Sequence, residues 1–165
     1  MKTLAKLTIL LFTITLISCN GNYNVIGGIE GSGNVVREKR NLEASFTKIK
    51  ASTGIQLLLE QNSPSKVEVE VDDNLMKYII TKVENGTLIV KIDGNINSMK
   101  SVIVRVVMPN IESLETSSGS SIKAVEKISG NTMVMKTSSG SSIEGEIEYE
   151  KVSCESTSGS EIKVS

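Results

Sequence analysis

The sequence predicts an all-β protein, a β-solenoid or β-helix-like stack of short strands with repeats of about 20 residues. Two patterns predict it. Most of the chain after Phe46 alternates apolar and polar residues with a period of two, as strands do. In the last third, a motif rich in Ser, Thr and Gly occurs three times. Between these motifs no amphipathic stripe of helical spacing is longer than two turns, which excludes a helical fold.

The composition argues against an enzyme and against a nucleic-acid-binding protein. The 165 residues carry a formal net charge of −1 and contain neither His nor Trp. Nucleic-acid-binding proteins show a basic excess. Without His, the usual general base and a common zinc ligand are missing, so we expect no catalytic residues, no metal and no cofactor. Aromatic residues make up 3%, which leaves few flat side chains for stacking against sugars or bases.

Residues 1–18 have the pattern of a bacterial lipoprotein signal peptide. Lysines at positions 2 and 6 precede the apolar run 7–17, which is too short to span a bilayer. The run ends in Leu16-Ile17-Ser18-Cys19, which resembles a lipobox, where the cysteine becomes the lipid-carrying N-terminus. We therefore expect Cys19 to be the lipidation site and the chain to be held at a membrane through its lipid.

The mature chain divides into a tether and one domain. Residues 19–33 are rich in Gly and Asn and are expected to form a flexible tether. Residues 34–165 are expected to form a single β-solenoid domain. If Cys19 carries lipid, Cys154 is the one cysteine left, so no intramolecular disulfide is expected. Cys154 is expected to be a small buried residue.

The strands of the first half follow from alternation and turn signals. The dipeptide Asn85-Gly86 favours a type I′ turn and so predicts a hairpin. Residues 73–78 are expected to form a helical turn, and the charged run 37–40 a solvated edge. The predicted strands are Ile55 to Gln61, Lys66 to Asp72, Ile79 to Glu84, Thr87 to Ile92 and Val102 to Met108.

The repeat predicts where the chain turns corners. Residues 116–123 return as 137–144 and again as 156–163, and residues 51–55 are a weaker echo. Glycine adopts backbone angles that other residues resist, and short hydroxyl side chains bond to nearby backbone groups. We therefore expect Gly119, Gly140 and Gly159 to lie one over another at the same corner of successive coils, with the following isoleucine pointing inward.

Two features of this region have alternative interpretations. The repeated Ser, Thr and Gly residues, called here the Ser/Thr-Gly ridge, either only form the turns at the corners of the coils or also make a polar surface that binds glycans or another surface. The residue types do not distinguish these two interpretations. With a period of two, Glu144, Glu146, Glu148 and Glu150 are expected on one face of one strand. Such a row could gather Ca²⁺, but it is more often a solvated face, and no metal site is expected. Met133 and Met135 in one coil, and Val152 and Cys154 in the next, are expected to face the core.

Several segments together resemble a known family. Residues 31–36, then Phe46 and Ile49, then residues 52–55 resemble the start of the head GIN domain of the "putative auto-transporter adhesin" family common in Bacteroidetes lipoproteins. Residues 78–80 and 85–88 fit its hairpin region, and the Ser-Gly-Ser repeats fit its coils. The resemblance implies a β-solenoid-like fold on the cell envelope and an adhesin-like role, and it offers no catalytic residues. Gln56 departs from the family name, which suggests Asn at that position.

We therefore expect a non-enzymatic cell-envelope lipoprotein, anchored by lipid in the outer membrane on its periplasmic or surface face, with an adhesin-like or structural module. The expected partners are the membrane and an envelope protein or glycan. One alternative is a periplasmic assembly partner that offers an edge strand to another protein. The other is a polysaccharide-active enzyme, which would need a groove with converging charged groups. The sequence stops in mid-repeat at Ser165, and the uncapped edge is expected to invite pairing, including a homo-oligomer.

Overall fold

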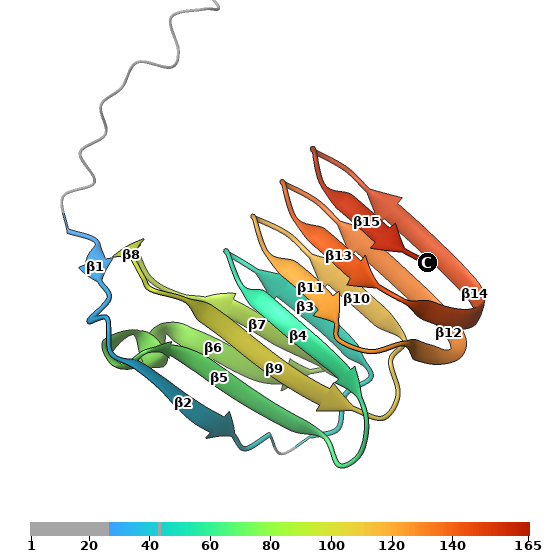
Figure 1. The fold of residues 1–165 in the computed structure, drawn as a ribbon, viewed down its shortest axis with the longest axis horizontal. Helices are drawn as coiled ribbons and strands as arrows, with labels where there is room; N and C mark the ends of the chain where they lie inside the picture. Colours follow the sequence, from blue (N-terminus) through green and yellow to red (C-terminus); the bar gives the residue numbers. More distant parts are fainter. Residues whose placement is uncertain (1–26, 43) are drawn as a thin grey trace, which may run out of the picture.

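The protein is described by a computed structural model that covers residues 27–42 and 44–165. Within these residues the secondary structure is β apart from one 3₁₀ helix, η1 (Asp73–Tyr78), so the all-β prediction is confirmed (Figure 1). The expected signal peptide, Cys19 and most of the expected tether lie outside the described residues.

Two sheets lie face to face with the core between them (Figure 1). The six-stranded sheet has the order β14 (Ile147–Ser156), β12 (Ile128–Thr137), β10 (Ser113–Thr116), β3 (Lys48–Ser52), β7 (Thr87–Ile92) and β6 (Ile79–Glu84). The seven-stranded sheet has the order β15 (Glu161–Val164), β13 (Ser142–Gly145), β11 (Ser121–Ala124), β4 (Gln56–Gln61), β9 (Val102–Met108), β5 (Lys66–Asp72) and β2 (Val35–Arg40).

Four strand pairs pass from one sheet to the other and stack in parallel register. They are β3–β4, β10–β11, β12–β13 and β14–β15. Equivalent residues of the sequence repeat are hydrogen-bonded neighbours, such as Thr116 beside Thr137 and Ile122 beside Ile143. The first pair contains the weaker echo of the repeat and lies directly against β10 and β11, although β5 to β9 intervene in the chain.

The other end of the stack is antiparallel. Strands β6 and β7 form the predicted hairpin, with φ of 50° at Asn85 and 72° at Gly86. Strand β5 pairs antiparallel with β9 and with the edge strand β2, which contains the charged run 37–40. Ile29–Glu30 forms β1 and pairs with β8 (Ile96–Ser98), so this part of the expected tether is attached to the body.

Inward-facing aliphatic side chains fill the space between the sheets. Met133 and Met135 are fully buried, as predicted. The prediction was wrong for their counterparts in the next coil, because Val152 is 46% exposed and Cys154 is exposed as well. Strands β14 and β15 are the end strands of the two sheets in the described stack, so the side chains of β14 have a neighbouring coil on one side there.

The passage within each of the four strand pairs uses the same tight turn. A Ser or Thr with φ between 53° and 65° is followed by a Gly with φ between 68° and 73°. In the second turn the Ser120 N–H donates to the Ser117 carbonyl at 3.2 Å, which fits a type I′ turn. The turns line up along one side of the stack (Figure 1) and contain Thr53-Gly54, Ser118-Gly119, Ser139-Gly140 and Ser158-Gly159.

Hydrogen bonds connect each turn to the next. The N–H of Gly119 donates to the Ser139 carbonyl at 3.1 Å, and the N–H of Gly140 donates to the Ser158 carbonyl at 3.1 Å. The N–H of Gly54 donates in the same way to Ser118 at 3.0 Å. The structure therefore places the three predicted glycines at equivalent positions of adjacent turns.

A serine follows Gly119, Gly140 and Gly159, and its hydroxyl is hydrogen-bonded within the stack. Ser141 is buried, and its Oγ lies 2.9 Å from Thr116 Oγ1 and donates to the Ser138 carbonyl at 2.8 Å. Ser160 Oγ donates to Thr137 Oγ1 at 2.9 Å. A buried hydroxyl without a partner would be costly, so this pairing explains why small hydroxyl residues recur on both sides of the turn.

The turn predicts a specific response to a small substitution. A Cβ added at Gly140 would meet no atom within 4 Å, so Gly140→Ala adds only the cost of the left-handed backbone conformation. We expect the free energy of unfolding to fall by about 1 to 2 kcal/mol in urea denaturation. Ser139→Gly is the matched control, since its φ is also positive, and it should change stability by less than about 0.5 kcal/mol. Equal effects of the two substitutions would contradict this account of the turn.

Candidate functional site: a polar hollow on the flank of the stack

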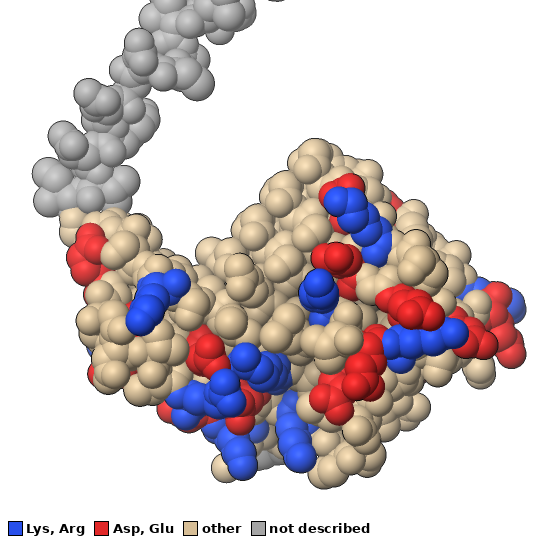
Figure 2. Space-filling view, in the orientation of Figure 1, with Lys and Arg blue, Asp and Glu red and all other residues tan. Residues whose placement is uncertain are grey.

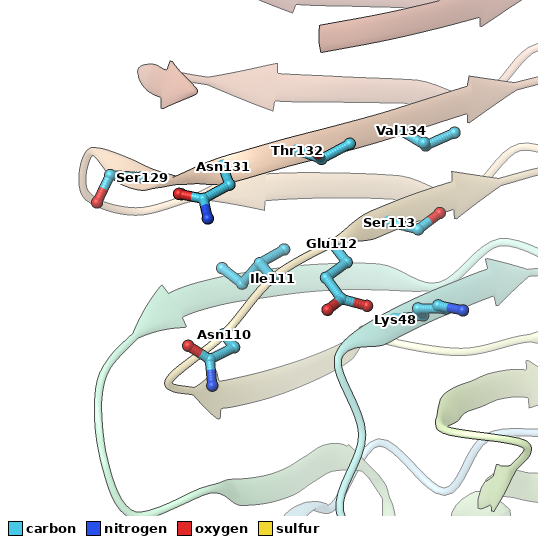
Figure 3. A pocket seen from close by; sticks show the side chains of 10 residues that line it. Lys48, Asn110, Ile111, Glu112, Ser113, Ser129, Asn131, Thr132 and Val134 are labelled. Atoms are coloured by element: carbon cyan, nitrogen blue, oxygen red, sulfur yellow. The ribbon is translucent and has the colours of Figure 1, made fainter. Parts of the chain in front are cut away.

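A hollow of about 600 Å³ lies where β3, β10 and β12 begin (Figure 3). The loop between β9 and β10 contributes Asn110, Ile111 and Glu112. The first half of β12 contributes residues 129–132, and the start of β3 contributes Lys48. The turn glycines follow the opposite ends of the same strands, so the hollow and the Ser/Thr-Gly ridge are separate surfaces.

Local sequence explains the shape of both walls. Pro109 follows β9 directly and cannot donate to a further sheet hydrogen bond, so the strand ends and a loop begins. In β12, Gly130 lies beside Tyr149 of β14, and a Cβ at Gly130 would lie 2.6 Å from the ring. Glycine is therefore required at this position for the ring to pack against the wall of the hollow.

Two side chains from different sheets, Gln61 of β4 and Tyr149 of β14, fix the walls. The Gln61 amide donates from Nε2 to the Ser129 carbonyl at 2.8 Å and to the Pro109 carbonyl at 3.1 Å. Its Oε1 accepts from the Ser129 N–H at 2.7 Å. The Tyr149 hydroxyl donates to the Ile111 carbonyl at 3.1 Å. Because these bonds join the loop to β12 and β14, the hollow is held open before any ligand arrives.

The lining combines hydrogen-bond donors and acceptors with a small apolar surface. Figure 3 shows Asn131 extending from β12 toward the segment that carries Asn110 and Ile111. The Glu112 carboxylate accepts from the Thr47 hydroxyl at 2.8 Å. Lys48 brings the opposite charge, so the charged groups of the lining sum to zero.

The lining lacks the pair of carboxyl groups that glycoside hydrolysis normally uses. Glycoside hydrolysis normally uses two carboxyl groups that face each other across the substrate. Glu112 is the single acidic residue among the residues that line the hollow, and none of them is a Cys or a His. The side chains suit binding through hydrogen bonds.

The predicted row of glutamates is not on one strand, and that prediction was wrong. Glu144 lies in β13 and Glu148 in β14, because the chain bends between the two strands at Glu146. Lysines of the preceding coil pair with these acids: Lys127 Nζ lies 2.8 Å from Glu148, and its hydrogen bond lowers the pKa of that carboxyl. Among the residues that the structure describes, no group of three or more Asp, Glu, Cys or His is arranged to hold a metal ion.

Charges on the surface are mixed. On the face seen in Figure 2, Lys and Arg side chains intermingle with Asp and Glu and form no large patch of one sign. Ion pairs connect adjacent coils, including Lys50 with Glu115 at 2.5 Å and Lys136 with Glu155 at 3.2 Å. Within the described residues, no helix is both long and apolar enough to cross a membrane.

The predicted turn glycines are not part of the hollow. Cys19 lies outside the described residues, and the three glycines lie at the turns between the sheets. Sequence reasoning did not find the hollow, because residues far apart in the chain build it. The sequence signals for its two walls are Pro109, which follows the end of β9, and Gly130, which leaves room beside β12 for the Tyr149 ring.

Comparisons with known proteins identify relatives by family and by fold. A family model described as "putative auto-transporter adhesin, head GIN domain" matches residues 45–165. A comparison with curated proteins found no match.

Solved structures share the fold. A protein named a putative adhesin from Parabacteroides distasonis is 22% identical, with a TM-score of 0.77 over 84% of this chain. A putative adhesin from Parabacteroides merdae is 20% identical, with a TM-score of 0.75 over 83% of this chain. A putative lipid binding protein from Parabacteroides distasonis is 18% identical, with a TM-score of 0.67 over 74% of this chain. This chain covers 59%, 58% and 55% of those three proteins.

The packing of Tyr149 predicts its titration. Burial raises the pKa of the Tyr149 phenol to about 12. An unfolded tyrosine ionises near pH 10, so the unfolded state loses its proton first, and stability should fall as the pH rises from about 10 to 12. Ultraviolet absorbance should show one phenol titrating late, and Tyr149→Phe should remove it. A late phenol that persists in Tyr149→Phe would contradict the assignment.

Proposed function

Because the chain belongs to the family described as "putative auto-transporter adhesin, head GIN domain", we propose that it is a non-enzymatic cell-envelope lipoprotein with an adhesin-like β-solenoid module. The module binds a neutral, hydroxyl-rich ligand, a glycan, in the polar hollow. The observation that carries this proposal is the hollow itself, whose walls are fixed by Gln61 and Tyr149 and whose lining is rich in amide and hydroxyl groups.

The solenoid assignment rests on the stacked strand pairs. Repeat units 21 and 19 residues apart occupy neighbouring positions in both sheets, in parallel register. Each unit contacts mainly the units before and after it, which is the arrangement of repeat proteins. Such a body holds its surface groups at fixed spacings, and this suits a module that binds other surfaces.

The envelope location rests on the leader and on the family. The lipobox-like Leu16-Ile17-Ser18-Cys19 supports lipidation at Cys19, and the family name supports a location at the cell envelope. We place the chain at the outer membrane, attached by its lipid, on either the periplasmic or the surface face. Several acyl chains on one residue would hold it firmly, since a single chain binds only marginally.

The chemistry of the hollow favours a neutral glycan over an acidic one. Asn side chains offer a donor and an acceptor together, which matches two neighbouring hydroxyl groups of a sugar. The charges of Lys48 and Glu112 cancel, so the lining gives no net attraction to an anion. Because no aromatic side chain lines the hollow, binding of a single sugar should be weak, with a Kd of order 1 mM.

We expect the side-chain amide of Asn131 to contribute directly to sugar binding. Saturation-transfer NMR with galactose, mannose and N-acetylglucosamine should give signals for at least one sugar, and Asn131→Ala should weaken that binding about fivefold. Asn41→Ala is the matched control, because Asn41 is exposed and lies outside the hollow. N-acetylneuraminic acid should bind no better than the neutral sugars. Equal sugar binding by the Asn131→Ala and Asn41→Ala variants would contradict the assignment of sugar binding to the hollow.

The lipid anchor has its own test. With an alkyne-labelled fatty acid, the full chain should incorporate label in cells, and Cys19→Ala should abolish it. Cys154→Ser is the matched control and should be labelled normally. Unchanged labelling of Cys19→Ala would overturn the lipoprotein assignment.

A second candidate function is that of a periplasmic assembly partner that offers an edge strand to another protein, and the edge strands β2 and β6 of the two sheets favour it. A pull-down dominated by one envelope protein, with no sugar binding in the hollow, would support it over adhesion. The enzyme alternative has less support, because the hollow has a single acid. Measured turnover of envelope glycans by the protein would support the enzyme alternative.

A further inference from the structure

An amide group of the chain itself bridges the two walls of the hollow. Residues 129–132 form one wall, called here the β12 wall, and residues 109–112 form the other, called the loop wall. The Gln61 Nε2 donates to the Ser129 carbonyl on the β12 wall at 2.8 Å and to the Pro109 carbonyl on the loop wall at 3.1 Å. Its Oε1 accepts from the Ser129 N–H at 2.7 Å. A planar amide therefore fits between the two walls and bonds to both.

The next position along both walls carries an asparagine. Asn110 follows Pro109 on the loop wall, and Asn131 lies two residues after Ser129 on the β12 wall. Both residues are exposed and both line the hollow. Figure 3 shows them on opposite walls, with Ile111 between them. A ligand that lies beside the Gln61 amide therefore meets one amide side chain on each wall.

Strand pairing leaves this part of the β12 wall open. Strand β10 pairs with β12 from Val134 onward, so the stretch Ser129 to Thr132 lies beside the loop wall and not beside β10. All four residues of this stretch are exposed, whereas Ile128 and Met133 on either side of it are buried. The alternation of the strand is interrupted here, and the β12 wall is accessible to a ligand.

A secondary amide matches two opposed walls. In its trans form the N–H and the C=O point in opposite directions, so one group faces each wall. An asparagine side chain offers both a donor and an acceptor, so it can bond to either group. A hydroxyl rotates to suit its surroundings and has no such fixed pair of directions. Val134 in the lining is apolar and half-buried, which suits a methyl group attached to the amide.

We propose that the hollow is specific for N-acetylhexosamines, whose acetamido group lies between Asn110 and Asn131. One asparagine accepts from the acetamido N–H, and the other donates to the acetamido carbonyl. The hydroxyl groups of the sugar face the remaining polar side chains of the lining, among them Ser113 and Thr132. The proposal rests on the sugar-binding function proposed for the hollow and names the class of sugar.

A peptide also contains secondary amides, but the lining suits a sugar better. Amides recur at every residue of a peptide, whereas the lining has one pair of asparagines. The other uncharged polar side chains of the lining are the hydroxyls of Ser113, Ser129 and Thr132. Hydroxyl groups donate and accept, which matches the ring hydroxyls of a sugar.

A series of ligands tests which group is recognised. In NMR titrations of the full chain in mild detergent, N-acetylglucosamine should bind about tenfold tighter than glucose, because the acetamido group adds two hydrogen bonds. 2-O-acetylglucose is the matched control ligand, since it keeps the carbonyl and the methyl but lacks the N–H. It should bind about threefold more weakly than N-acetylglucosamine. Equal binding of glucose and N-acetylglucosamine would overturn this proposal and leave sugar binding in the hollow standing, whereas no binding of any sugar would overturn both.

A substitution tests where the acetamido group lies. Asn110→Ala should reduce the preference for N-acetylglucosamine over glucose from about tenfold to about threefold and change glucose binding less than about twofold. Asn110 is exposed, so the urea denaturation curve should stay the same. Asn41→Ala, outside the hollow, is the matched control and should keep the full preference. An unchanged preference in Asn110→Ala would overturn the proposal, and so would N-acetylglycine methylamide binding as tightly as N-acetylglucosamine, which would indicate a peptide.

Discussion

The structure depends on a turn that passes between two sheets in two left-handed residues. Each strand pair must change sheets and still remain in parallel register with its neighbours on both sides. A Ser or Thr followed by Gly achieves this, and the glycine N–H then bonds to the next turn. The inward hydroxyl of the following serine is satisfied by a Thr or by the turn itself, so the corner tolerates burial without an unpaired polar group.

This constraint explains why the irregular features lie on the other side of the stack. The turns are nearly identical, which leaves no room for insertions between the paired strands. Between β4 and β10, by contrast, the chain makes the excursion β5 to η1 to β9 and returns to stack on β3 and β4. The hollow lies at that return, bounded by the loop after Pro109 and the start of β12. A regular corner and an irregular flank with the proposed binding hollow thus lie on two sides of one body.

Local patterns were sufficient to predict the strands whose partners are near in sequence or whose alternation is strict. The hairpin at Asn85-Gly86 and the strand Lys66–Asp72 agree with the structure. Other features depend on distant contacts and were not predicted correctly. Strands β1 and β8 are too short to show a period of two, and the hollow depends on the contact of Gln61 with Ser129, 68 residues away in the sequence. Val152 and Cys154 have the same alternation as Met133 and Met135, but burial depends on a neighbouring strand, and alternation carries no information about that.

The weakness of the proposed hollow and the proposed lipid anchor are physically linked. A single hollow without an aromatic platform would release a sugar quickly. Weak sites gain most when several act together, because the second contact becomes intramolecular once the first has formed. Copies of the chain held by lipid in one membrane would present several hollows to a repeating glycan. Weak binding in the hollow and anchoring by lipid are therefore compatible parts of one adhesin-like design.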